Sequence, residues 1–177
     1  MSRSPSTFPW PATLTTDRLV LRPIEAGDVP AMARLWTDEA VRRHLGGPVD
    51  KETLRVREQH CVGARGAFSV TLRTAGAVIG VVQLEPDSRR AGRTEVSYQL
   101  LPEHWGFGYG REAVAAAVAW VREATTSSEG SEEVVAVTQE ANARSRRLLE
   151  SIGMEQTETF VEWGAAQVLY SAGDPRA

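Results

Sequence analysis

The residues best suited to bind a ligand form a glycine-rich run, Trp105-Gly106-Phe107-Gly108-Tyr109-Gly110-Arg111-Glu112. The run lies between a segment with the alternation of a strand and an alanine-rich segment with the period of a helix. Glycine lets backbone N–H groups approach a ligand without hindrance from Cβ, and the amino end of a helix adds about half a positive charge. The run therefore predicts a phosphate-binding loop, with a turn that only starts the helix as the alternative.

The same residues exclude two familiar phosphate motifs. A nucleotide P-loop needs Lys-Ser or Lys-Thr after its last glycine, where this sequence has Arg111-Glu112. A dinucleotide fingerprint needs the spacing G-x-G-x-x-G, whereas the spacing here is G-x-G-x-G.

A second group of polar residues opens the segment Asn142 to Met154. Asn142 is suited to cap a helix, and Ser145 lies one turn further on, so both side chains can point toward the same place. Gly153 is suited to end that helix.

Hydrophobic periodicity places these motifs in a single mixed α/β domain. We expect Asp28 to cap a helix with Val29, Met32, Leu35 and Trp36 on one face. A second helix follows Asp50, with Leu54, Cys61 and Val62 inward. Further helices are predicted over residues 112–121 and 142–151, and strands over 18–22, 67–72, 78–84, 95–100, 134–138, 157–161 and 167–170.

With these motifs in this order, the chain resembles the GNAT superfamily of acetyl-CoA-dependent N-acetyltransferases. Within it, the chain resembles the branch that acetylates ribosomal-protein N-termini (Rim-type). The resemblance covers residues 13–172 and rests on three segments: Thr16-Asp17-Arg18-Leu19-Val20-Leu21-Arg22-Pro23, Pro102 to Ala113, and Asn142 to Met154.

The resemblance implies a mixed, mostly antiparallel sheet of about seven strands with helices on both faces. Its fourth and fifth strands, here 96–101 and 134–138, splay apart to admit the pantetheine arm of acetyl-CoA. The implied cofactor-binding residues are Gln99, Leu100 and Leu101 for the pantetheine, Gly106, Phe107, Gly108, Tyr109, Gly110 and Arg111 for the pyrophosphate, and Asn142 and Ser145 near the thioester. Phe107 departs from the family, which often has a basic residue there. Leu149 stands where many members have a tyrosine acid.

Acyl transfer from acetyl-CoA to an amine requires a base for the amine and a proton for the leaving thiolate. Glu95 is the candidate base, acting directly or through water, with a solvated strand carboxylate as the alternative. Glu162 is a second candidate base. Ser145 is the candidate acid. His104 either relays protons or packs beside the glycine loop. A rival hypothesis is a GNAT domain that binds acyl-CoA as a sensor or scaffold without turnover.

Composition narrows the remaining possibilities. The 177 residues carry a formal charge of −3 with no basic stripe, so we expect no nucleic acid as partner. The GNAT resemblance implies an amine acceptor, which is either a protein N-terminus or a small amine. Lys51 is the only lysine among twenty basic residues, an arginine excess that codon usage explains. The single cysteine and the scattered histidines predict no disulfide and no metal site.

The two ends of the chain carry the remaining expectations. No run approaches the ~20 apolar residues of a membrane helix, and the amino terminus does not look like a secretory signal, so we expect a cytoplasmic protein without membrane contact. Residues 1–13 are expected to form a flexible arm, 14–172 the domain and 173–177 a tail. Phe8 and Trp10 could contribute a homodimer contact or belong to the arm.

Overall fold

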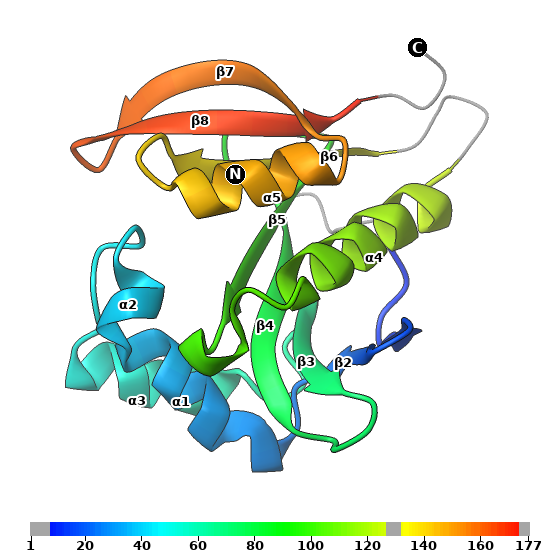
Figure 1. Cartoon of the computed structure of the whole chain (residues 1–177), viewed down its shortest axis with the longest axis vertical. Helices are drawn as coiled ribbons and strands as arrows, with labels where there is room; N and C mark the ends of the chain where they lie inside the picture. Colours follow the sequence, from blue (N-terminus) through cyan, green and yellow to red (C-terminus); the bar gives the residue numbers. More distant parts are fainter. Residues whose placement is uncertain (1–7, 127–131, 174–177) are drawn as a thin grey trace. The chain divides into compact units, whose positions relative to one another are not determined.

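The computed structural model describes residues 8–126 and 132–173. Eight strands form one sheet in the order β1-β2-β3-β4-β5-β6-β8-β7 (Figure 1). The pairing is antiparallel along most of the sheet, while β5 and β6 are parallel. The strands are β1 Leu14–Thr15, β2 Leu19–Pro23, β3 Ala67–Leu72, β4 Val78–Pro86, β5 Arg93–Leu100, β6 Glu133–Gln139, β7 Glu155–Glu162 and β8 Ala165–Ala172.

The helices complete the mixed α/β fold predicted from the sequence. The α-helices are α1 Val29–Thr37, α2 Glu39–Arg42, α3 Lys51–His60, α4 Tyr109–Ala124 and α5 Ala143–Ser151; short 3-10 turns are η1 Ala26–Asp28 and η2 Pro102–His104. The fourth and fifth strands of the prediction are β5 and β6.

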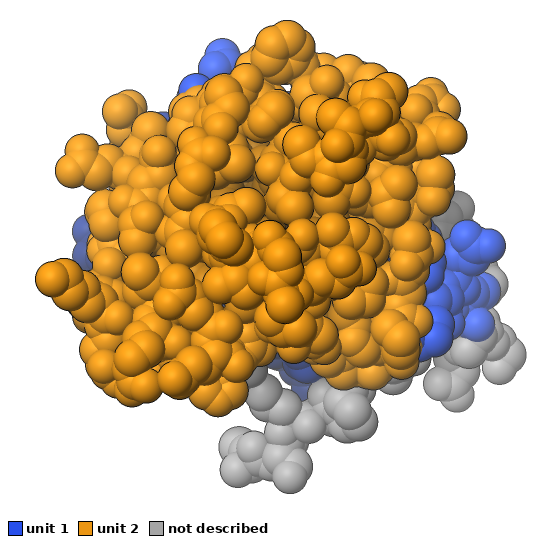
Figure 2. All heavy atoms as spheres, turned by 90° about the horizontal axis from the view of Figure 1, so that it is seen from below, with its two compact units in different colours: residues 1–9, 84–97, 114–177 blue, residues 10–83, 98–113 orange. Residues whose placement is uncertain are grey.

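The contacts of the chain divide it into two compact units (Figure 2). Unit 1 holds Met1–Pro9, Leu84–Ser97 and Val114–Ala177, and unit 2 holds Trp10–Gln83 and Tyr98–Ala113. Each unit is described by itself below. The predicted domain boundaries at residues 14 and 172 stay predictions.

In unit 2, helices α1 and α3 pack against each other and share an apolar core with residues of β3 and β4. Met32, Leu35 and Trp36 are buried in it, as the helical spacing predicts. Asp50 caps α3 by accepting a hydrogen bond from the backbone N–H of Thr53 at 2.7 Å. Asp28 does precede α1, but its carboxylate does not cap that helix; it accepts the backbone N–H of Glu25 at 2.9 Å and completes the capping box of η1. The carboxylate is buried between Arg22 and Ser69, each at 2.7 Å, and the ion pair with Arg22 satisfies its buried charge.

In unit 1, α5 lies along the sheet formed by β6, β8 and β7 (Figure 1). Trp163 and Gly164 turn the β7–β8 hairpin with φ of 55° and 72°, the left-handed pair that a two-residue hairpin turn requires. The ladder between β5 and β6 has three pairs and ends at Glu95↔Val135, while β6 stays paired with β8 as far as Gln139. This short ladder agrees with the predicted splay.

Several local predictions are wrong. Helix α2 was missed because four residues carry no period. Helix α4 begins at Tyr109, three residues earlier than predicted, because Gly110 lies within its first turn and does not interrupt it. Val62 is 49% exposed rather than inward, because α3 has already ended at His60. The polar, glycine-containing segment 125–133 also predicts an exposed loop, and its residues 127–131 lie outside the described residues.

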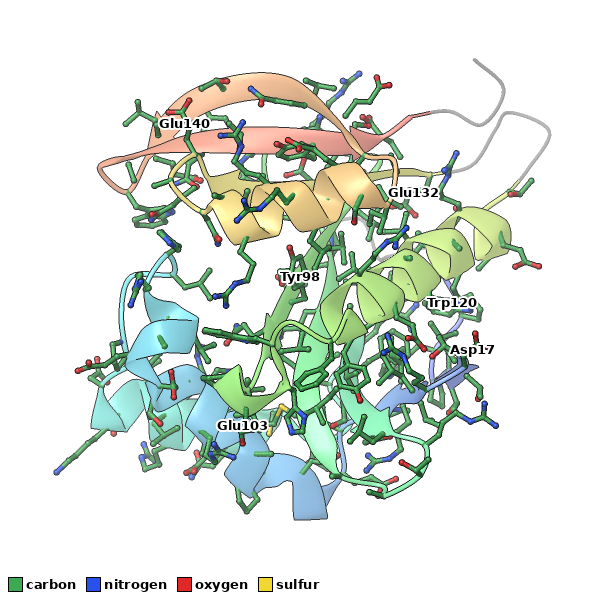
Figure 3. The ribbon with its side chains drawn as sticks, in the orientation of Figure 1. Asp17, Tyr98, Glu103, Trp120, Glu132 and Glu140 are labelled. Atoms are coloured by element: carbon green, nitrogen blue, oxygen red, sulfur yellow. The ribbon has the colours of Figure 1, made fainter. Side chains whose placement is uncertain are left out.

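The amino-terminal aromatics are also not exposed in an arm, although residues 1–7 of that arm lie outside the described residues. Phe8 is 1% exposed and packs against Trp120, labelled in Figure 3, with ring centroids 5.2 Å apart. Trp10 packs edge-on against Phe68 within unit 2, at 5.0 Å. Both rings are therefore occupied within their own units.

Gly80 of β4 permits a close approach to β5 inside unit 2. A Cβ at this position would overlap the carbonyl oxygen of Gln99 and lie 3.0 Å from Cγ of Leu100. The neighbouring backbone N–H of Leu101 donates to the carbonyl of Ile79 at 2.8 Å, which holds the two segments together.

We therefore predict that Gly80→Ala lowers the free energy of unfolding by about 1–3 kcal/mol, because the methyl group forces backbone apart. Urea denaturation measures this change. Gly27→Ala is the matched control, since a Cβ there meets nothing within 4 Å, and it should change stability by less than about 0.5 kcal/mol. Equal stabilities for the two variants would contradict the close approach.

Candidate functional site

The glycine loop opens helix α4 in unit 2, as predicted. Gly106 and Gly108 have φ of 84° and 80°, a backbone conformation that residues other than glycine rarely adopt. The N–H of Glu112 donates to the carbonyl of Gly108 at 3.1 Å, so the helical hydrogen bonding starts there. The first turn of α4 therefore follows the exposed loop directly, and the amino end of the helix gives this loop a positive pole that favours an anion.

Residues far away in the sequence hold this loop. Oε1 of Glu112 accepts from the Thr16 hydroxyl at 2.6 Å and from the Arg18 backbone N–H at 2.9 Å. Oε2 of Glu112 accepts from Nε of Arg18 at 2.7 Å. Arg18 also donates from NH1 to the carbonyl of Phe107 at 2.8 Å. The turn before β2 is thus tied both to the loop and to the first turn of α4.

The charge of Glu112 depends on these contacts. Partial burial raises the pKa of its carboxyl, but the hydrogen bonds from Thr16 and Arg18 outweigh that effect and lower the pKa below its usual value. Glu112 is therefore ionised at neutral pH, when it also complements the helix dipole.

The end of β5 supplies the predicted pantetheine residues of unit 2, but two of their backbone groups are engaged. The carbonyl of Leu100 accepts from Nε1 of Trp105 at 2.9 Å, and the N–H of Leu101 donates to Ile79. Gln99 differs from both, because its buried Oε1 has no hydrogen-bond partner within the described part of the chain. A buried acceptor of this kind calls for a donor.

His104 packs beside the glycine loop, as one of the two alternatives predicts. Its ring meets that of Tyr109 edge-on, with centroids 6.3 Å apart.

In unit 1, one arginine joins both candidate bases. Arg89 donates from NH1 to Oε2 of Glu95 at 2.8 Å and from NH2 to Oε2 of Glu162 at 2.9 Å. The same guanidinium contacts the buried Asp87 at 3.3 Å. Glu95 and Glu162 therefore share one counter-charge, and neither is an isolated carboxylate.

Burial raises the pKa of Glu95 above its usual value, although the hydrogen bond and charge of Arg89 oppose that rise. The nearby charges of Asp87 and Glu85 raise the pKa further. Such a carboxylate is a stronger base than an exposed one.

Helix α5 carries the other two predicted residues of unit 1. Oδ1 of Asn142 accepts from the N–H of Ser145 at 3.2 Å, so Asn142 does cap the helix. Arg146 and Glu150 anchor the helix to Tyr170 of β8, whose hydroxyl donates to Glu150 at 2.7 Å. Ser145 is half-buried, whereas Leu149 is fully buried and faces the core.

Comparison with known proteins now bears on these groups of residues. The family pattern described as an acetyltransferase (GNAT) domain matches residues 18–155. The chain belongs to the GNAT acetyltransferase family.

Relatives and solved structures agree with that assignment. The uncharacterized N-acetyltransferase YoaA of Bacillus subtilis is 26% identical over 92% of this chain and 90% of its own length. The N-acetyltransferase p20 of Bacillus licheniformis is 28% identical over 58% of this chain and 61% of its own length, so the chain spans less than two thirds of that relative.

Among solved structures, an acetyltransferase from Agrobacterium tumefaciens has a TM-score of 0.77 at 24% identity, covering 98% of this chain and 100% of its own. The ribosomal-protein-S5-alanine acetyltransferase of Vibrio fischeri has a TM-score of 0.71 at 18% identity, covering 93% and 98%. At these identities the likeness shows the GNAT fold.

GNAT enzymes normally use acetyl-CoA, and the residues of this chain fit it. The left-handed glycines and the first turn of α4 suit a pyrophosphate, and the orphaned Oε1 of Gln99 suits an amide N–H of pantetheine. Within the described ranges, no three potential metal ligands gather. The described helices also include none long and apolar enough to cross a membrane.

The sequence did not reveal that Arg89 pairs with both candidate bases. It also did not reveal the contacts that Thr16 and Arg18 make with Glu112. The conspicuous Thr16–Pro23 segment marked the latter pair without revealing their partner, because Arg18 and Glu112 are 94 positions apart. The charged loop around Arg89 carried no signal.

We predict that Arg89→Gln raises the pKa of Glu95 further, because the carboxylate loses its hydrogen bond and faces Glu85, Asp87 and an unpaired Glu162. Carbon-13 NMR titration of the glutamate carboxyls measures this, with the signal assigned from Glu95→Gln. Arg146→Gln, which removes an arginine on α5, is the control and should leave that pKa unchanged. An unchanged or lowered pKa in Arg89→Gln would show that the ion pair has no influence.

Proposed function

We propose that the protein is an acetyl-CoA-dependent N-acetyltransferase that transfers the acetyl group directly to a primary amine. The observation that carries the proposal is the left-handed glycine loop at the amino end of α4, within the region that matches the GNAT family. The exposed backbone of this loop, at the amino end of a helix, suits an anionic cofactor.

The proposal assigns binding to the residues predicted from the sequence. The amides of Gly106 to Arg111 bind the pyrophosphate, and Gln99 accepts from the pantetheine arm. Asn142 and Ser145 lie near the thioester. Leu100 and Leu101 contribute shape more than hydrogen bonds, because Trp105 and Ile79 already engage their backbone.

The chemistry requires a balanced movement of protons. The bond between the amine nitrogen and the acetyl carbon forms as the bond from that carbon to sulfur breaks, and the sulfur leaves with the electron pair. Glu95 accepts the proton that the nitrogen loses, directly or through water, with Glu162 as the alternative base. Ser145 donates a hydrogen bond or a proton to the departing thiolate. Holding amine and thioester together supplies a further large part of the rate.

The acceptor class is the least defined part of the proposal. The Rim-type motifs and the likeness to an S5-alanine acetyltransferase support a protein α-amine. A charge of −3 also suits a small cationic amine. An α-amine, with a pKa of about 7.7–8.0, needs less help from Glu95 than a lysine-type amine of about 10.4. A cytoplasmic location, a homodimer and the absence of nucleic-acid or membrane partners remain part of this proposal.

The function is tested by thiol release from acetyl-CoA with a panel of amines. The panel contains a peptide with a free N-terminus and one lysine, a polyamine and an aminoglycoside, and mass spectrometry locates the acetyl group. We expect the wild type to acetylate the peptide α-amine.

Gly108→Val should reduce acetyl-CoA affinity roughly 10- to 100-fold or more, because φ of 80° is strained for valine and its branches meet Arg18. Gly110→Ala, inside the helix, should stay within about 3-fold.

The alternatives predict different results in the same experiment. Acetylation of a polyamine or aminoglycoside without peptide turnover would replace the acceptor class. Binding of acetyl-CoA without thiol release from any amine would favour the sensor or scaffold. Absence of acetyl-CoA binding by the wild type would overturn the proposal.

Ser145→Ala provides a separate prediction about the acid. Loss of the hydroxyl should lower kcat roughly 10²-fold while the acetyl-CoA affinity changes little, because the hydroxyl acts on the leaving group. Ser151→Ala, at the other end of α5, is the control and should retain wild-type kcat. Full turnover by Ser145→Ala would mean that another group or water protonates the thiolate.

A further inference from the structure

Arg18 reaches across the glycine loop with its guanidinium held in a fixed plane. Nε and NH1 are used by Glu112 and by the carbonyl of Phe107, and the guanidinium carbon lies 4.6 Å from the centre of the Tyr109 ring. Two hydrogen bonds and one stacking contact orient a side chain that is still 46% exposed. A rigid fork of this kind loses little entropy when it binds a further anion.

The remaining nitrogen, NH2, points to the glycine at the centre of the loop. It lies 3.4 Å from the place of a Cβ on Gly108. Within the residues that the structure describes, NH2 has no hydrogen-bond acceptor, since the contacts of Arg18 use Nε, NH1 and the backbone. A guanidinium nitrogen with this freedom is available to an anion seated on the loop.

The electrostatics of the loop favour that anion. A cation at the amino end of a helix has the same sign as the helix dipole, so Arg18 is unfavourable there unless negative charge compensates it. Glu112 supplies one such charge. Between Gly106 and Gly110 the loop has no charged side chain of its own, and the guanidinium of Arg18 lies beside Gly108.

We propose that Arg18 is a phosphate-binding residue of this site, donating from NH2 to the pyrophosphate of the acyl donor. This inference rests on the proposed function, because that function supplies the pyrophosphate. It assigns to a residue 88 positions before Gly106 a positive charge that residues 106–110 do not carry themselves. Arginine suits the role, because one planar fork can hold the loop and still donate to a phosphate oxygen.

The test compares three acyl donors by isothermal titration calorimetry. Acetyl-CoA carries the pyrophosphate and the 3′-phosphate, dephospho-acetyl-CoA carries only the pyrophosphate, and acetyl-pantetheine carries neither. Arg18→Gln should lose roughly 10-fold or more in affinity for the first two donors, since a charge-assisted hydrogen bond is removed. Its affinity for acetyl-pantetheine should equal that of the wild type, and the loss for acetyl-CoA should shrink in high salt.

Three further variants separate charge from structure. Arg18→Lys keeps the charge and should recover part of the affinity. Arg73→Gln removes the hydrogen bonds that Arg73 donates to the carbonyls of Thr16 and Asp17, so it loosens the same turn while the charge of Arg18 is kept. This variant should lose less affinity for acetyl-CoA than Arg18→Gln. Arg55→Gln removes an arginine from an exposed pair on α3 and should change nothing.

Each contrary result overturns the assignment. Equal losses for all three donors, or equal losses in Arg18→Gln and Arg73→Gln, would leave Arg18 a purely structural residue. A loss confined to acetyl-CoA would assign it to the 3′-phosphate. If Arg18→Gln does not fold, Arg18→Lys is used for the test in its place. The assignment then requires that Arg18→Lys lose affinity for acetyl-CoA and dephospho-acetyl-CoA but not for acetyl-pantetheine. A wild type that binds no donor would refute the proposed function itself.

Discussion

The glycine loop depends on one ionised carboxylate, that of Glu112, in the first turn of α4. Glycines with positive φ lose more chain entropy on folding than other residues, so the loop needs support from outside itself. Glu112 provides it by accepting hydrogen bonds from Thr16 and from two groups of Arg18. Because these bonds are charge-assisted, they are stronger than neutral ones, and they fix the backbone before any ligand arrives. Pre-organisation of this kind lowers the entropic cost of binding.

A second arginine has the corresponding role in unit 1. Arg89 connects Glu95 of β5 with Glu162 of β7 and contacts Asp87 as well. The two candidate bases therefore belong to one charged cluster held by the same guanidinium. For that reason single substitutions of Glu95 and Glu162 will not have additive effects, and a double-mutant cycle is needed to separate them.

The sequence predicted what local chemistry determines. The strands with alternating apolar residues, the caps at Asp50 and Asn142 and the glycine loop depend on near neighbours, and each was found where expected. What failed depends on partners that are distant in the sequence. Phe8 is buried beside Trp120, and Asp28 directs its carboxylate to Arg22, Ser69 and the N–H of Glu25 rather than capping α1. The contact between Arg18 and Glu112 is of the same kind. The Thr16–Pro23 segment therefore indicated the family without indicating what Arg18 contacts.

The arginine excess illustrates where composition ceases to inform. Exposed arginines such as Arg34 and Arg55 form surface ion pairs, which contribute little to stability. Arg18 and Arg89 differ from them, because each uses separate nitrogens for separate partners. A lysine offers a single point charge and could not join two such acceptors in one plane. Arginines that are equivalent in a composition count therefore differ once their hydrogen-bond acceptors are known. Arg18 and Arg89, which organise the two candidate sites, make contacts that a lysine could not reproduce.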